Sequence, residues 1–133
     1  MFMKYIEYGL HDTAVNEIII EETGLTLLFR EGVYISDDTS KETSLSKPCK
    51  MIIYIEDFDK NRPFEHCSFY LCHKKHFSEV DFSDIKKLML KNRFDIDLDF
   101  YSPFARAISI RGHIGKYKAE IMITEIQSVE FEM

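Results

Sequence analysis

Three histidines and two cysteines lie within eleven residues, as His66-Cys67, Cys72-His73 and His76, and such side chains are common ligands of zinc. The segment is rich in strand-forming residues, and side chains on a strand alternate between its two faces. Cys67 and Cys72 therefore face opposite sides, as do His66 and His73, whereas His66 and Cys72 share a face but are roughly 20 Å apart. Only Cys72 or His73 can meet His76, in a turn. Because zinc needs three or four ligands, we predict no metal site in this cluster.

Three aspartates at alternate positions, Asp95, Asp97 and Asp99, form the second candidate site. On a strand they stand about 6.6 Å apart, which is too far for them to share one Ca²⁺ ion easily. Such a row is either a solvated face, paired across strands with Lys116 and Lys118, or an acidic docking surface for a basic partner. We take these three aspartates as the candidate binding residues and expect all three to be exposed.

The positions between and beside these aspartates are all apolar: Phe94, Ile96, Leu98 and Phe100. Strict alternation of apolar and acidic residues predicts a strand with one buried and one wet face, because a helix would scatter both sets around its circumference. We therefore expect the four apolar side chains to be buried together.

Catalysis has little support in the sequence. His11-Asp12 lies in an expected turn before the first strand, where Asp12 is predicted to make a local hydrogen bond rather than to act in a reaction. The sequence has no Gly-x-Ser-x-Gly elbow, and no Gly-rich loop of the kind that binds phosphate. We predict no catalytic residues and no cofactor.

Short strands must position these groups. A three-stranded meander is expected over 15–20, 25–30 and 33–35, with a hairpin turn at 21–24 that Gly24 favours. The polar residues 37–48 are predicted to form a loop.

One helix is predicted near 81–92, because apolar residues recur there at 82, 85, 88 and 89. Asp81 is the candidate N-cap, and lysines lie toward the end of the segment, where they complement the helix dipole. Further strands are expected over 49–57, 66–73, 94–101, 105–111, 116–126 and 128–132, with a Gly-flanked turn at 112–115.

These elements predict a mainly β fold on the border with α+β: an antiparallel sandwich or strongly curved sheet of about eight strands with one helix. With 133 residues and no linker-like stretch, residues 1–133 are expected to form a single domain. Hydrophobic residues make up 45% of the chain, which is enough for a packed core.

The formal charge of −6 disfavours nucleic acid as a partner, because a negative surface repels phosphate, and it favours a basic protein. The N-terminus has no signal-peptide pattern, and no window has the ~18 apolar residues of a membrane span. Three cysteines are an odd count without framework spacing, which predicts free thiols in a reducing cytoplasm.

The opening of the chain resembles small bacterial β-rich domains, some of which are grouped with polymorphic-toxin immunity proteins. The resemblance rests on the run from Tyr8 to Val15, on Ile18, and on the pattern from Leu25 through Phe29 to Tyr34. It covers about the first quarter of the chain and implies a small cytosolic binding protein, with no catalytic residues to transfer.

Two classes of function are compatible with these observations. The first is a non-catalytic protein-binding domain, with an immunity-like role against a basic partner as its most specific form. The alternative is a small-ligand binder or an enzyme with an aromatic-lined pocket in the curved sheet. A deep cavity with convergent polar groups favours the second class, and a flat or protruding acidic face favours the first.

Overall fold

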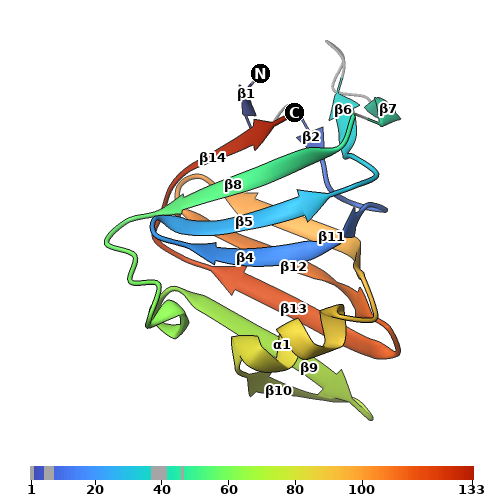
Figure 1. The fold of residues 1–133 in the computed structure, drawn as a ribbon, viewed down its shortest axis with the longest axis vertical. Coiled ribbons are helices and arrows are strands. Elements are labelled where there is room, and N and C mark those ends of the chain that lie inside the picture. The colour runs from blue at the N-terminus through green and yellow to red at the C-terminus, as the bar shows by residue number, and fades with distance from the viewer. Residues whose placement is uncertain (1, 5–7, 37–41, 46) are drawn as a thin grey trace.

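The computed structural model describes residues 2–4, 8–36, 42–45 and 47–133, and most of them lie in strands. Two antiparallel sheets make up the body of the protein (Figure 1). In spatial order the five-stranded sheet contains β1 (Phe2–Lys4), β14 (Ile126–Glu132), β8 (Cys49–Ile55), β5 (Gly24–Phe29) and β4 (Glu17–Glu21). The six-stranded sheet contains β10 (His76–Val80), β9 (Cys67–His73), β13 (Tyr117–Ile123), β12 (Ala107–Ile114), β11 (Phe94–Ser102) and β3 (Ala14–Val15). The predicted mainly β, antiparallel fold with one helix is confirmed.

A single apolar core lies between the two sheets. The five-stranded sheet contributes Leu27, Ile53 and Phe131, and the six-stranded sheet contributes Ile110 and Ile121, all of them at most 2% exposed. Burial of β-branched and aromatic side chains on both inner faces is the main source of stability in such a sandwich. The two sheets therefore have their other faces available to contact something else.

The helix α1 (Phe82–Met89) forms within the range predicted from apolar spacing. The backbone N–H of Asp81 donates to Asp84 Oδ2 at 3.1 Å, one arm of a capping box, so the expected N-cap is confirmed. Ile85 is fully buried, and the ring of Phe82 packs against that of Phe69 in β9 with centroids 5.4 Å apart. The helix thus covers the part of the six-stranded sheet that lies beyond β4 (Figure 1).

The strand predicted from the Phe-Asp-Ile-Asp repeat does form, as β11, but its faces were predicted wrongly. Against β12 the register runs from Ile96↔Gly112 directly to Leu98↔Arg111, which leaves Asp97 as the extra residue of a β-bulge. After the bulge the side chains again alternate between the two faces of the sheet, but the apolar positions now point to the outer face. Phe94 and Ile96 are buried as expected, whereas Leu98 is 59% and Phe100 66% exposed.

The bulge also explains Gly112, which was expected in a turn but lies inside β12. A Cβ at this position would come within 1.8 Å of the Asp95 carbonyl oxygen, so only glycine permits the close approach of the two strands. The turn itself follows at Gly115, whose φ of +60° is left-handed.

Two other expectations need correction. The hairpin of β4 and β5 forms with its turn at the predicted place, but the third strand of the meander does not join it. That strand, β6 (Tyr34–Ser36), pairs instead with β2 (Tyr8–Gly9) and β7 (Glu42–Leu45) in a separate small sheet. The predicted loop 37–48 therefore contains a strand; its residues 37–41 and 46 lie outside the described residues. Finally, β10 occupies a segment with no recognisable strand period.

Candidate functional site

The outer face of the six-stranded sheet carries an exposed apolar group, which we call the apolar strip and define as Leu98, Phe100 and Met122. Their exposed fractions are 59%, 66% and 40%. Phe100 lies opposite Ser109, which lies opposite Met122 on the next strand, so the strip crosses β11, β12 and β13. Together with Arg111 and other neighbours these residues line a shallow depression of about 470 Å³.

Polar groups border the apolar strip and are already paired with one another. Arg111 Nε lies 3.2 Å from Glu120 Oε2, and Ser109 Oγ donates to Glu120 Oε1 at 3.2 Å. An apolar centre beside a satisfied polar rim is the usual composition of a protein–protein contact surface. Exposed phenylalanine, leucine and methionine side chains favour association when a partner removes them from water.

The three candidate aspartates do not form one acidic face. Asp95 Oδ1 lies 2.9 Å from Arg93 Nε, and Asp97 Oδ2 lies 2.7 Å from His113 Nδ1. Asp99 comes after the bulge, opposite Ile110 of the inner face, and is only partly exposed. The expectation that all three are exposed is therefore wrong for Asp99.

The lysines expected to face the aspartates do not do so. Lys118 stands opposite His113, and Lys116 belongs to the turn before β13. Asp95 and Asp97 take their basic partners from Arg93 and His113 instead. The sequence pattern therefore identified the right strand but not the pairing of its carboxylates.

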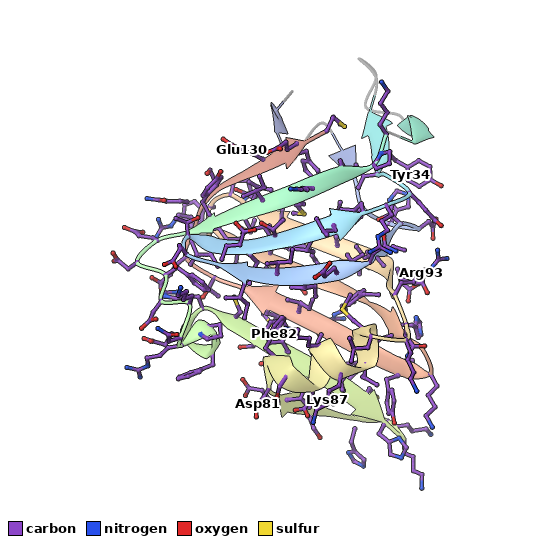
Figure 2. All side chains as sticks on the ribbon, viewed as in Figure 1. Tyr34, Asp81, Phe82, Lys87, Arg93 and Glu130 are labelled. Atoms are coloured by element: carbon purple, nitrogen blue, oxygen red, sulfur yellow. The ribbon has the colours of Figure 1, made fainter. Side chains whose placement is uncertain are left out.

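A group of glutamates occupies the outer face of the other sheet. Glu17 and Glu21 come from β4, and Glu130 and Glu132 from β14; none of them is ion-paired with another described residue (Figure 2 labels Glu130). These glutamates act on Tyr54 of β8. The pKa of its phenol is raised above 10.0, first by burial and then by the negative charges of Glu130, Glu132 and Glu21. An acidic group of side chains therefore lies on the outer face of the five-stranded sheet.

Cys67 and Cys72 lie on opposite faces of β9, as strand parity predicts, whereas His66 precedes the strand and ends η2. Cys67 is buried, and burial raises the pKa of its thiol to about 12, so that it stays protonated at neutral pH. Cys72 is on the outer face, opposite Lys118. His73 and His76 face each other across the hairpin of β9 and β10. Among the described residues, no three His, Cys, Asp or Glu side chains are grouped so that they could hold a metal ion.

His11 and Asp12 serve a turn between two strands. The ring of His11 stacks on that of Tyr34 with centroids 5.9 Å apart. Asp12 has a left-handed φ of +59°, and its backbone N–H donates to the Ile96 carbonyl oxygen at 2.8 Å. The predicted local hydrogen bond of Asp12 is therefore replaced by a backbone hydrogen bond that reaches β11.

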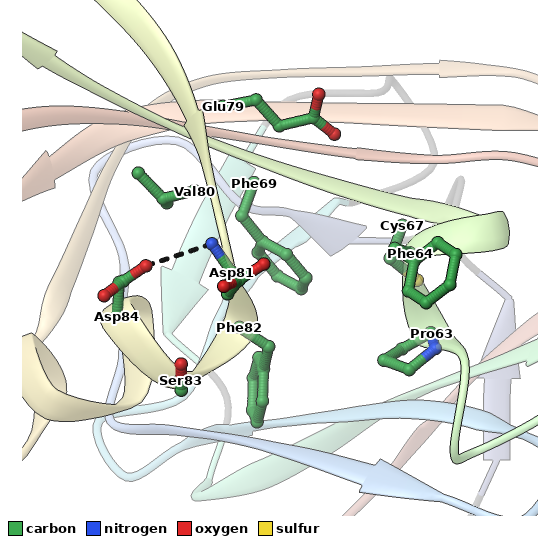
Figure 3. A pocket seen from close by; sticks show the side chains of 10 residues that line it. All are labelled: Pro63, Phe64, Cys67, Phe69, Glu79, Val80, Asp81, Phe82, Ser83 and Asp84. Carbon is green, nitrogen blue, oxygen red and sulfur yellow. Dashed lines mark hydrogen bonds between the residues drawn. The ribbon is translucent and has the colours of Figure 1, made fainter.

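A pocket of about 600 Å³ lies between the short 3-10 helix η2 (Pro63–Glu65) and the start of α1 (Figure 3). Three aromatic rings line it, those of Phe64, Phe69 and Phe82. Its carboxylates come from Glu79, Asp81 and Asp84. Aromatic faces combined with carboxylates suit an organic cation. The alternative hypothesis expected a pocket inside the curved sheet. The observed pocket lies instead at one end of the sandwich.

Comparison with known proteins adds no relative: no protein-family model, no curated protein and no solved structure matches this chain. Within the described residues, no helix is long and apolar enough to cross a lipid bilayer.

Proposed function

We propose that this chain is a non-catalytic protein-binding domain that contacts its partner with the outer face of the six-stranded sheet. The observation that carries the proposal is the apolar strip. Leu98 and Phe100 are more than half exposed in a sheet whose inner face buries every isoleucine of β12. Removing these side chains from water in a complex is favourable by roughly 25 cal/mol for each Å² covered.

The partner is expected to be a basic protein, because this chain carries a net negative charge. A net charge of −6 attracts a basic partner over a distance, which raises the rate of encounter more than the final affinity. Asp95 and Asp97 lie beside the strip, but each is already paired with a basic group. We therefore assign the exposed Asp95 and Asp97 to steering and the strip to the buried contact.

The resemblance of the N-terminal quarter suggests the most specific form of this function, an immunity-like role in which the domain neutralises a toxin by binding it. Nothing in that role requires a catalytic group. The high pKa of the Cys67 thiol agrees with it, since a protonated, buried thiol is a poor nucleophile.

The test compares partner capture by matched variants. Leu98→Ser combined with Phe100→Ser should abolish capture of the partner that the wild type retains from host extract, without loss of folding. Phe64→Ser is the control, because Phe64 is 64% exposed but lies at η2, outside the strip. Equal capture by all three proteins would exclude the strip as the contact surface.

A second experiment isolates the carboxylates. Replacing Asp95, Asp97 and Asp99 by asparagine should slow association and reduce its salt dependence, while the dissociation rate changes little. An unchanged association rate across salt concentrations would remove the aspartates from the steering role.

The pocket between η2 and α1 supports a second candidate, the binding of a small organic cation. The supporting observation is that three aromatic rings and the residues Glu79, Asp81 and Asp84 line one cavity, although Asp84 Oδ2 already accepts the Asp81 backbone N–H. Titration with tetramethylammonium and with spermidine, followed by NMR shifts around Phe82, tests it. Binding that Phe64→Ser weakens and the strip variant leaves intact would favour this function over protein binding.

A further inference from the structure

The open edge of the five-stranded sheet faces α1 across a groove of about 500 Å³. One wall is β4 together with Asn16 and Arg30, and the other is the helix face that carries Phe82, Lys86, Met89 and Leu90. Figure 2 shows the ring of Phe82 on the side of the helix toward this strand. The groove is a different surface from the apolar strip, which lies on the outer face of the other sheet.

Strand β4 is the last strand of its sheet, and β5 is its only partner strand among the described residues. One row of its backbone N–H and C=O groups therefore points into the groove instead of toward a neighbouring strand. Such an edge is a template on which another extended chain can pair. Addition of a strand to a sheet edge is a recurring mode of peptide recognition, with affinity from the backbone and specificity from alternate side chains.

The side chains of β4 alternate in a way that specifies the partner. Ile18 is 6% exposed and Ile20 is half-buried against the core, so these two point inward. Glu17 and Glu21 are exposed on the outer face and have no ion pair with another described residue. A strand added antiparallel to β4 would place its inward residues near Ile18, Ile20 and the helix, and its outward residues opposite the two glutamates.

We infer that this groove binds an extended peptide segment in which basic and apolar residues alternate. Apolar side chains of the peptide pack on Ile20, Phe82 and Met89, and basic side chains lie opposite Glu17 and Glu21. Lys86 is exposed and has no ion pair with another described residue. Its ammonium group can donate to the carbonyl oxygens on the second edge of the bound peptide.

A second copy of this chain is a poorer occupant. Antiparallel pairing of two β4 strands about Ile19 would set Glu17 of each copy against Glu21 of the other, at both ends of the pair. Like charges directly opposite one another destabilise a strand pair. Acidic residues that flank an isoleucine triplet therefore oppose self-association while they favour a basic guest.

The probe is a short peptide in which lysine alternates with valine, titrated against the wild type with NMR detection. Shifts are expected along β4 and on the Phe82–Leu90 face of α1. Two isomers of the peptide, N-methylated on the lysine amides or on the valine amides, test the backbone pairing. One isomer should bind at least tenfold more weakly, because its methyl groups block the edge that pairs with β4. Equal binding by both isomers would overturn the inference.

Charge variants test whether the basic side chains of the peptide lie opposite Glu17 and Glu21. Glu17→Lys combined with Glu21→Lys should weaken the lysine–valine peptide at least tenfold and bind a glutamate–valine peptide instead. Glu130→Lys combined with Glu132→Lys is the matched control, since it makes the same charge change on the same sheet face but on β14. If both double variants lost the same affinity for the peptide, the attraction would be unspecific, and the inference that the peptide binds in the groove would be overturned.

Two further measurements separate this site from the proposed function and from dimerisation. The Leu98→Ser/Phe100→Ser variant should keep full affinity for the lysine–valine peptide, because its changes lie on the other sheet. Parallel loss of peptide binding in that variant would contradict a separate groove. Sedimentation should give a monomer, and a dimer that Glu17→Lys/Glu21→Lys abolishes would assign the edge to a second copy instead.

Discussion

Strands β8 and β11 differ in how regularly their own side chains alternate. β8 lies in the interior of its sheet and pairs with β5 without a register shift, and its one shift against β14 comes from an extra residue on β14, Gln127. β8 itself therefore alternates between buried and more exposed side chains from Cys49 to Ile55. β11 does the same only as far as the bulge at Asp97, after which Leu98 and Phe100 are exposed. The difference teaches that one extra residue determines which side chains the protein keeps for its core and which it presents to a partner.

The largest test of this comparison uses two phenylalanines of the same strand. Phe94→Ala should lower the free energy of unfolding by about 3–5 kcal/mol, because Phe94 is fully buried and leaves a cavity. Phe100→Ala should change it by less than about 0.5 kcal/mol, because Phe100 is 66% exposed. Urea denaturation of the two variants measures both values. Similar losses would mean that the strand alternates regularly to its end.

The bulge itself is the next point to test. Gly112→Ala should cost about 1–3 kcal/mol, because the new methyl group would overlap the Asp95 carbonyl oxygen and force the two strands apart. Gly115→Ala provides the comparison. It should cost about 1 kcal/mol through its left-handed φ, without disturbing β11. If Gly112→Ala were as stable as the wild type, the close approach at the bulge would be absent.

The ion pair at the bulge should matter less. Asp97→Asn is expected to change the free energy of unfolding by only a few tenths of a kcal/mol, because the carboxylate and His113 are both substantially exposed. A double-mutant cycle with His113→Ala measures their coupling directly. A coupling above about 1 kcal/mol would show that the pair, and not Gly112, fixes the bulge.

The smallest effect is expected on β8, where Tyr54 points to the acidic outer face. Folding raises the pKa of this phenol, so the folded state favours its protonated form. That contribution to stability is present below pH 10 and is lost as the pH rises through the folded-state pKa. Tyr54→Phe should therefore lose less stability than the wild type as the pH rises above 10. Equal alkaline losses in denaturant titrations would contradict the shift.

Local signals were enough to predict some elements from the sequence. The helix was found because Asp81 and the apolar spacing lie within one short segment, and the hairpin turn at 21–24 was found through Gly24. β10 was missed because its residues are almost all exposed, so no burial period marks it.

Features that depend on distant residues could not be predicted in the same way. The bulge requires Gly112 on a different strand, and the Asp-x-Asp-x-Asp pattern contains no sign of it. The choice of partner by β6 likewise depends on β2, which lies far away in the sequence. The strand β11 was therefore predicted, whereas the side chains that it exposes after the bulge were not.

The position of β14 has a consequence for how the protein is made. Residues 126–132 fill the place between β1 and β8, and they bring Ile126, Val129 and Phe131 into the core. In a nascent chain that ends before residue 126, the edges of β1 and β8 that pair with β14 are therefore unpaired. Much of the apolar surface of the five-stranded sheet is then exposed as well. Such long-range pairing is slow. We expect the two sheets to close only after residues 126–132 have been synthesised and can pair, so a chaperone that binds the unfinished sheet should raise the yield of folded protein.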